Sequence, residues 1–281
     1  MPSELEQIRD QQRQTWDKFS AGWKKWDEQV LNWLAPVGQE LIRSAALRDT
    51  SNVLDVAAGT GEPGLSAAAL VPKGTVTVTD LSDRMLEVAA DKAARRGIGN
   101  FRTKQCDAGA LPFPDNSFDA VLCRFGFMFF PDVDTCVKEF VRVARPGARV
   151  CTAVWDVPDR NPWATTIMET ISKYVDMPTP PPGSPGLFRC AAPGYMETAF
   201  RKGGLKDIAV KNVVGELNLK SAEEYWSLMT EVAAPVVAGL TKSDEQTRQK
   251  IEATVLDLVR KTSLDGKPRL PSSAITISGT K

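Results

Sequence analysis

Alternation of strand-like and helix-like segments between residues 51 and 155 constrains the fold of this chain more than any other feature. Short segments rich in β-branched residues recur there, and most lead into a longer segment with helical spacing of its apolar residues. The predicted strands are 52–57, 75–79, 101–105, 118–124 and 148–155, and the predicted helices are 62–71, 83–96 and 132–144. This order predicts an α/β fold, a parallel sheet with helices on both faces.

Apolar residues recur every three or four positions across residues 3–34, which predicts one helix, or two with a break near Gly22. Four of the seven tryptophans lie on this stripe: Trp16, Trp23, Trp26 and Trp33. Such a stripe is typical of a helix packed on the core through its aromatic face, and a lid over a cofactor or substrate cleft is the alternative. Both interpretations remain open at this point.

The pattern changes after residue 156. Prolines are frequent in residues 157–192, which we interpret as a stiff loop that contributes to the substrate site. The segments beyond it predict a helix at 193–202, a strand at 207–218, helices at 221–239 and 243–262, and a final strand at 274–279. We therefore expect four parts: a helical cap (1–50), an α/β core (51–156), the loop (157–192) and the rest of the sheet with inserted helices 221–262 (193–281).

Charge and composition exclude several functions. The 281 residues carry 35 basic and 35 acidic side chains, so no basic footprint for nucleic acid exists. No apolar run approaches the ~20 residues of a membrane span, and we expect a cytoplasmic protein. The five cysteines form no C-x-x-C pair and fit buried, reduced thiols. The chain has no histidine, which removes His-based nucleophile systems and His-dependent metal sites, so we expect no metal.

Residues 53–61 (VLDVAAGTG) combine an apolar strand, an acidic residue and a turn of small residues. Gly59, Gly61 and Gly64 fit the G-x-G-x-x-G spacing of dinucleotide sites, and Asp80 follows at roughly the ~20 residues that this pattern requires. A turn of this kind lets the backbone approach a ligand closely. By itself, it does not distinguish a nicotinamide cofactor from another cofactor that contains adenosine.

Four elements in order sharpen this interpretation: residues 54–61, 78–86, 107–119 and 139–147. Together they resemble the class I S-adenosylmethionine-dependent methyltransferases, and especially the ubiquinone/menaquinone C-methyltransferase family and its small-molecule relatives. The resemblance covers roughly a third of the chain. It implies a Rossmann-like, doubly wound sheet of seven mostly parallel strands, with an N-terminal helical lid and C-terminal helical insertions.

The resemblance also implies roles for individual residues, with S-adenosyl-L-methionine as the cofactor. Small residues of the first turn leave room for its methionine half: Ala57, Gly59, Thr60 and Gly61. Asp55 helps to hold the ammonium group, and Asp80 accepts hydrogen bonds from the ribose hydroxyls. The family often has a glycine where Ala57 stands, so this position departs mildly from its pattern.

The remaining residues implied for the cofactor surround the adenine. Leu81 and Met85 flank the ring, Asp107 accepts from its exocyclic amine, and the Ala108 amide reaches a ring nitrogen. Two further residues are expected to contact the cofactor: Trp23 from the N-terminal stripe, and Arg124 at the end of the fourth strand. Arginine is a departure from the family at that position, and whether its side chain faces the substrate stays open.

We hypothesise in-line methyl transfer to a small, apolar or aromatic acceptor, with catalysis mainly by positioning and no catalytic residue assigned. A respiratory quinone C-methyltransferase, an NAD(P)-dependent oxidoreductase and a non-catalytic cofactor-binding protein are the alternatives. None of Tyr174, Tyr195 or Tyr225 has a lysine four residues later, which weakens the oxidoreductase alternative. We expect a small-molecule acceptor and no nucleic acid as partners, and leave a homodimer open.

Overall fold

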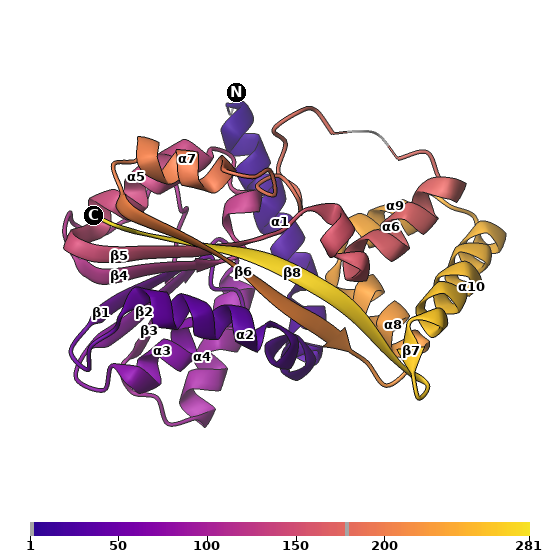
Figure 1. Ribbon diagram of the computed structural model, residues 1–281, viewed down its shortest axis with the longest axis horizontal. Coiled ribbons are helices and arrows are strands. Elements are labelled where there is room, and N and C mark those ends of the chain that lie inside the picture. The colour runs from indigo at the N-terminus through magenta and orange to yellow at the C-terminus, as the bar shows by residue number, and fades with distance from the viewer. Residues whose placement is uncertain (1–2, 178–179) are drawn as a thin grey trace.

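One twisted sheet runs through the protein, as the computed structural model of residues 3–177 and 180–281 shows (Figure 1). Its strands follow the order β3-β2-β1-β4-β5-β8-β6, with the two-residue β7 paired to β8. Their bounds are β1 Asn52–Val56, β2 Thr75–Asp80, β3 Phe101–Gln105, β4 Phe118–Arg124, β5 Ala144–Trp155, β6 Lys206–Asn218, β7 Ser263–Leu264 and β8 Lys267–Thr280. Strands β1 to β5 run parallel to one another, and β8 is antiparallel to both β5 and β6. The predicted seven-stranded, mostly parallel sheet is confirmed.

Helices cover both faces of the sheet. In Figure 1, α2, α3 and α4 lie below it and α5 and α7 above it, while α6, α8, α9 and α10 gather where β6 and β8 extend beyond the other strands. Their bounds are α1 Glu4–Lys25, α2 Asp27–Ala45, α3 Gly64–Leu70, α4 Asp83–Arg95, α5 Val133–Val143, α6 Pro162–Tyr174, α7 Tyr195–Lys202, α8 Ala222–Val232, α9 Ala234–Thr241 and α10 Glu245–Lys261. Two single-turn 3₁₀ helices are η1 Phe127–Phe129 and η2 Pro158–Arg160.

The order of the strands reverses direction between β1 and β4, and this position is the switch point of the sheet. The chain moves from β1 outward to β2 and β3, and then returns to β4 on the other side of β1. Strands β1 and β4 are buried at their centres, where Leu54 and Val121 have no exposed surface. Ligands of such sheets bind at the carboxyl ends of the strands beside the switch point. The turns after β1, β2, β3 and β4 are therefore the part of the fold to inspect for a site.

The N-terminal helices break at Trp26 and not near Gly22, and the second helix continues to Ala45, beyond the predicted end at residue 34. Gly22 lies inside α1, where a Cβ atom would come within 2.0 Å of the backbone oxygen of Glu231 in α8. The glycine thus permits close packing of two helices. The weak helix propensity of glycine suggested a break in the helix at Gly22. The contact with α8 explains why a glycine stands at this position inside a continuous helix.

The segment 157–192 contains a helix that the proline count concealed. Pro162 occupies the first turn of α6, where a proline lacks no hydrogen bond, and Trp163, Ile167 and Ile171 are buried at helical spacing. The interpretation of all of 157–192 as a loop is wrong for this part. Pro178 and Thr179 of the proline run lie outside the described residues.

The predicted helix 221–239 is divided into α8 and α9 at Ala233, because Pro235 begins a new helix and cannot continue the old one. Within the part of the chain that the structure describes, no helix is both long and apolar enough to cross a membrane. The division of the chain at residues 50, 156 and 192 stays a prediction.

Candidate functional site

The turn between β1 and α3 has three residues in the left-handed region of backbone conformation: Ala57 (φ 56°), Gly59 (φ 54°) and Gly61 (φ 104°). A Cβ atom on Gly61 would lie 2.8 Å from Leu65 and 2.9 Å from Ala89, so this glycine is needed for packing. A Cβ atom on Gly59 would meet no atom of residues 3–177 or 180–281 within 4 Å. The backbone at Gly59 therefore borders open space, as expected for a turn that accepts a ligand.

Asp80, the last residue of β2, fastens two turns together. Its Oδ2 accepts a 2.9 Å hydrogen bond from the Gly59 amide, and its Oδ1 accepts one of 2.9 Å from the Ser82 amide. Burial raises the pKa of this carboxyl, while the two amide donors act in the opposite direction. Each carboxylate oxygen has two lone pairs, so both can accept a further donor. The carboxylate is thus compatible with a ribose diol, and that role stays a prediction.

Asp55 is fully buried and only half satisfied. Its Oδ2 accepts a 2.7 Å hydrogen bond from the Gly64 amide. Its Oδ1 has no hydrogen-bond partner among residues 3–177 and 180–281. Burial raises the pKa of the carboxyl to about 8. Because an unmet buried acceptor is costly, a cationic ligand group beside Asp55 would satisfy the oxygen and favour its ionised form.

The other predicted residues occupy the same edge of the sheet. Leu81 follows β2, and Met85 in the first turn of α4 is buried. Asp107 follows β3 by two residues and accepts a 2.9 Å hydrogen bond from the Gly109 amide, and Ala108 is buried beside it. These four residues are brought to one edge, but their contacts with adenine stay predictions.

Thr60, Trp23 and Arg124 complete the predicted set. The Thr60 hydroxyl donates a 2.7 Å hydrogen bond to Asp27, so its side chain already has a protein partner. The ring of Trp23 lies 6.1 Å from that of Trp16 on α1, and its Nε1 is buried without a partner within the described part of the chain. Arg124 is the last residue of β4.

Helix α1 and the start of α2 are bonded to three turns of the site. Arg9 forms an ion pair of 3.5 Å with Asp107, and Asp17 accepts a 2.6 Å hydrogen bond from the Ser82 hydroxyl. Asp27 accepts from the Thr60 hydroxyl and, at 2.8 Å, from Lys92. The N-terminal helices thus lie over the turns that follow β1, β2 and β3. This position is what a lid requires.

The sequence reasoning missed these polar contacts because it followed the tryptophan stripe alone. Arg9, Arg13 and Asp17 recur at every fourth position and therefore line one strip of the helix surface. A line of charged residues is usually a solvated face. Here, however, the two outer residues of the line face the sheet edge.

Aromatic rings gather where β4 and β5 end. Phe125 follows β4 and stacks on Trp155, with ring centroids 4.2 Å apart and planes 14° from parallel. Trp155, the last residue of β5, also stacks with Trp33 of α2 at 5.5 Å. Trp163 of α6 lies 4.6 Å from Trp33 and 4.7 Å from Trp155. We call these four residues the aromatic cluster.

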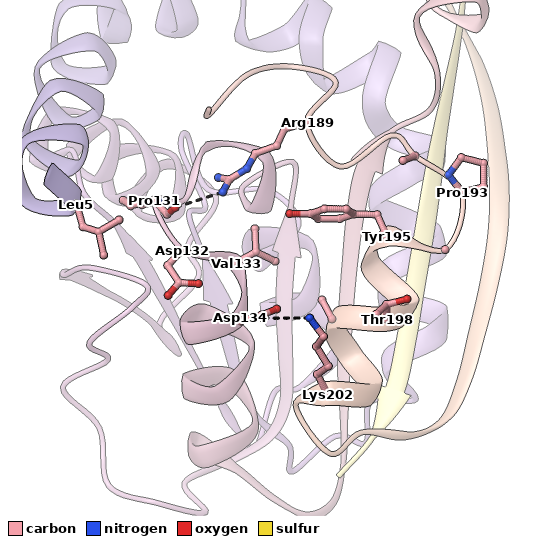
Figure 2. A pocket seen from close by; sticks show the side chains of 13 residues that line it. Leu5, Pro131, Asp132, Val133, Asp134, Arg189, Pro193, Tyr195, Thr198 and Lys202 are labelled. Carbon is pink, nitrogen blue, oxygen red and sulfur yellow. Dashed lines mark hydrogen bonds and ion pairs between the residues drawn. The ribbon is translucent and has the colours of Figure 1, made fainter. Parts of the chain in front are cut away.

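A separate cavity of about 600 Å³ lies between the N-terminal ends of α5 and α7 (Figure 2). Asp134 and Lys202 form an ion pair of 3.5 Å at its wall, and Arg189 donates to the Pro131 carbonyl. Figure 2 shows Tyr195 from α7 projecting over it. None of the residues predicted to bind the cofactor lines this cavity. Its charged groups are largely paired, and it is distinct from the site at the switch point.

The residues at the switch point fit S-adenosylmethionine. The unmet Oδ1 of Asp55 suits an ammonium group, and the open side of Gly59 leaves space against the backbone. The carboxylate of Asp80 is placed at the end of the neighbouring strand, where dinucleotide folds hold a ribose.

Comparison with known families agrees with this fit. Residues 53–147 match the family model described as a methyltransferase domain, and residues 7–98 match one described as lysine methyltransferase. The ubiquinone/menaquinone biosynthesis C-methyltransferase UbiE of Shewanella sediminis is 38% identical over 122 residues, which are 43% of this chain and 49% of that protein. The chain thus spans about half the length of the curated relatives it matches.

Solved structures confirm the fold. The YcgJ protein of Bacillus subtilis superposes with a TM-score of 0.57 at 21% identity, over 87% of this chain and 97% of that one. The phosphoethanolamine N-methyltransferase 2 of Haemonchus contortus, determined with S-adenosyl-L-methionine, gives a TM-score of 0.53 at 18% identity, over 87% of this chain and 52% of that one. At these identities the likeness concerns the fold alone.

Proposed function

We propose that this protein, whose residues 53–147 match the methyltransferase domain family, binds S-adenosylmethionine and catalyses methyl transfer to a small, apolar or aromatic acceptor. One observation carries the proposal: the buried Oδ1 of Asp55, at the turn where the family binds its cofactor, has no partner among the residues that the structure describes. A bound ammonium group would complete this carboxylate. The remaining residues of the predicted set lie at the same edge of the sheet.

The cofactor, when bound, supplies a methyl group that its sulfonium makes electrophilic. The task of the protein is then to hold the cofactor, to align the acceptor with its methyl group and to exclude water from both. In this proposal Asp80 and Asp107 orient the adenosine, Asp55 holds the ammonium group, and Leu81 and Met85 contact the adenine. Helices α1 and α2 exclude water from above. No histidine is needed for these tasks, and the chain has none.

We place the acceptor against the aromatic cluster. Phe125 directly follows β4, the strand beside the turn of residues 57–61, which we call the methionine turn, and its ring is half-buried. The cluster draws Trp33 from α2 and Trp163 from α6, the helix within the segment 157–192 that we expected to contribute to the substrate site. The C-terminal helices reach α1 through Glu231 of α8, whose carboxylate accepts from Lys25 and Trp26. Stacked rings favour a flat, apolar acceptor.

Calorimetry with S-adenosylhomocysteine tests cofactor binding. We expect wild type and the surface control Asp134→Ala to bind it equally, and Asp80→Ala to bind it at least about tenfold more weakly, because charged hydrogen bonds contribute ~1.5–3 kcal/mol each. Thermal stabilisation by NAD(P) and not by S-adenosylhomocysteine would overturn the proposal in favour of an oxidoreductase.

Radiolabelled methyl transfer to a panel of hydroquinones, catechols, aromatic amines and aliphatic amines tests catalysis. Methylation of a ring-bearing acceptor supports the proposal. Binding of S-adenosylhomocysteine with no methylation of any acceptor would instead favour a non-catalytic cofactor-binding protein. Methylation of the aliphatic amines alone would contradict the placement of the acceptor against the aromatic cluster.

A further inference from the structure

Arg124 lies on the same face of the sheet as Asp55 and beyond it toward the carboxyl end. Asp55 in β1 pairs with Leu122 in β4. Side chains alternate along a strand, so Leu122 and Arg124 project to the same face as Asp55. The Nη1 atom of Arg124 would lie 3.9 Å from a Cβ atom built on Gly38, which places the guanidinium between the sheet and α2.

The turn that follows Arg124 touches the methionine turn. A Cβ atom on Gly126 would lie 2.8 Å from the Cβ of Ala57, so the two backbones are in close contact there. Arg124 and the predicted binding turn are therefore neighbours in space, although different strands carry them.

The guanidinium of Arg124 has no bonded partner. Across residues 3–177 and 180–281, its side chain makes no hydrogen bond and no ion pair within 4.0 Å. Burial lowers its pKa, and the carboxylates of Asp55, Glu62 and Asp27 oppose that shift from a distance. A partly buried guanidinium with five donors and no acceptor is unusual, because such groups are normally paired.

Two of the three nearby carboxylates are bonded elsewhere. Glu62 pairs with Arg96 at 2.9 Å and accepts from the Ser66 hydroxyl at 2.7 Å. Asp27 accepts from Lys92 and from Thr60. Of these three carboxylates, only Asp55 retains a buried oxygen without a partner in the described part of the chain, and it is not within ion-pair distance of Arg124.

The site therefore presents an unpaired cation and an unmet anionic acceptor on one face, at the ends of adjacent strands. A ligand group with both an ammonium and a carboxylate would satisfy both at once. We propose that Arg124 binds the carboxylate of the amino-acid end of S-adenosylmethionine, opposite Asp55. This inference rests on the proposed function. It gives Arg124 a role in holding the cofactor, and the geometry of a guanidinium allows two parallel hydrogen bonds to the carboxylate.

Calorimetry with three ligands tests this role without measuring turnover. The ligands are S-adenosylhomocysteine, its decarboxylated analogue and 5′-deoxy-5′-methylthioadenosine, which lacks the whole amino-acid end. We expect wild type to bind S-adenosylhomocysteine about 10–100-fold more tightly than the decarboxylated analogue, as for a charged hydrogen-bonded pair. Arg124→Met should remove this difference while changing the affinity for the decarboxylated analogue by less than about threefold.

Arg124→Lys keeps the charge and provides a second test that does not depend on whether Arg124→Met folds. It should retain part of the preference for the carboxylate, because lysine cannot form the paired hydrogen bonds. Arg201→Met, an exposed substitution in α7, is the matched control and should behave as wild type. Urea unfolding of each variant shows whether it is folded under the conditions of the titration.

Equal weakening of all three ligands in Arg124→Met and Arg124→Lys would overturn the inference, since a structural role has no preference for a carboxylate. So would wild-type affinities that are equal for S-adenosylhomocysteine and its decarboxylated analogue. If wild type binds none of the three ligands, the proposed function itself fails. The two failures are therefore distinguishable.

Discussion

The Ser82 hydroxyl joins α1 to the edge of the sheet by donating a 2.6 Å hydrogen bond to Asp17. The same oxygen accepts from the Met85 amide and so caps α4. Ser82 has no exposed surface, and it directly follows the turn that Asp80 fastens. One side chain thus connects the position of α1 to the end of β2.

Replacing Asp17 with alanine should loosen α1 while leaving the α4 cap intact, because only the acceptor for the Ser82 hydroxyl is lost. We expect amide hydrogen exchange in residues 4–25 to quicken about tenfold, the effect of ~1.5 kcal/mol for a hydrogen bond to a charged group. Dissociation of S-adenosylhomocysteine should quicken as well. Exchange mass spectrometry and stopped-flow measurements check both rates. Gln14→Ala, an exposed change on the same helix, is the control, and equal exchange in the two variants would contradict the role of Asp17.

Asp27 neutralises Lys92, a lysine that is only 5% exposed. Asp27→Ala should lower the free energy of unfolding by about 3 kcal/mol, because it leaves a buried ammonium without its partner. Lys92→Met should cost less, and the double variant should be more stable than Asp27→Ala alone. Urea denaturation of the three variants measures the coupling. Simple additivity of the two single losses would show that the pair does not act as a unit.

Ala57 has a φ of 56°, a conformation that costs an L-residue with a side chain roughly 1 kcal/mol relative to glycine. Ala57→Gly should therefore raise the free energy of unfolding by about 0.5–1 kcal/mol. Ala58→Gly, at the next and buried position, should lower it. Both can be measured by urea denaturation. Destabilisation by Ala57→Gly would show that packing of the methyl group outweighs the backbone strain.

Asp55→Asn should stabilise the free protein at alkaline pH. The folded-state pKa of about 8 lies above the ordinary 3.8, so between these values the folded protein holds a proton that the unfolded chain does not. Wild-type stability from this group is fully present below pH 4 and is lost as the pH rises toward 8. The advantage of the asparagine variant in Tm should grow across that window to about 2–4 °C or more, which corresponds to at least ~1 kcal/mol.

Differential scanning fluorimetry from pH 4 to 9 gives this comparison directly. Addition of S-adenosylhomocysteine should reverse the order at pH 8, because wild type gains a bond to the ligand ammonium that the amide cannot match. A Tm difference that does not depend on pH would contradict the raised pKa.

Local patterns were sufficient to predict the sheet and the turn that follows β1. The strand that ends near Asp55 and the turn with Gly59 and Gly61 follow from alternation, β-branched residues and small side chains. Helix α6 was missed because its prolines were counted together, although Pro162 begins a helix and does not prevent one. The prediction of a break at Gly22 was wrong because it also relied on residue type alone, whereas the contact of Gly22 with α8 explains the glycine.

The polar contacts of the site were beyond the reach of local patterns. Two ion pairs form only when the chain has folded: Arg9 with Asp107, and Lys92 with Asp27. Neither spacing nor composition indicates which acidic side chain pairs with which basic one. Arg124 could be marked as a departure from the pattern of the family that the chain resembles, but its lack of a partner among the described residues is visible only in three dimensions. Each of these contacts depends on where the fold places its residues.

Gly22 lets α1 lie directly on the backbone of α8, and the opposite side of α1 is bonded to the turns after β2 and β3. A single rigid element therefore belongs to two interfaces at once. If one ligand fixes the position of α1 from the edge of the sheet and another fixes the same position from the side of α8, each ligand raises the affinity for the other. The factor is the same in both directions. A substitution that tilts α8 consequently changes the affinity of the edge of the sheet for its ligand, without altering any residue that lies there.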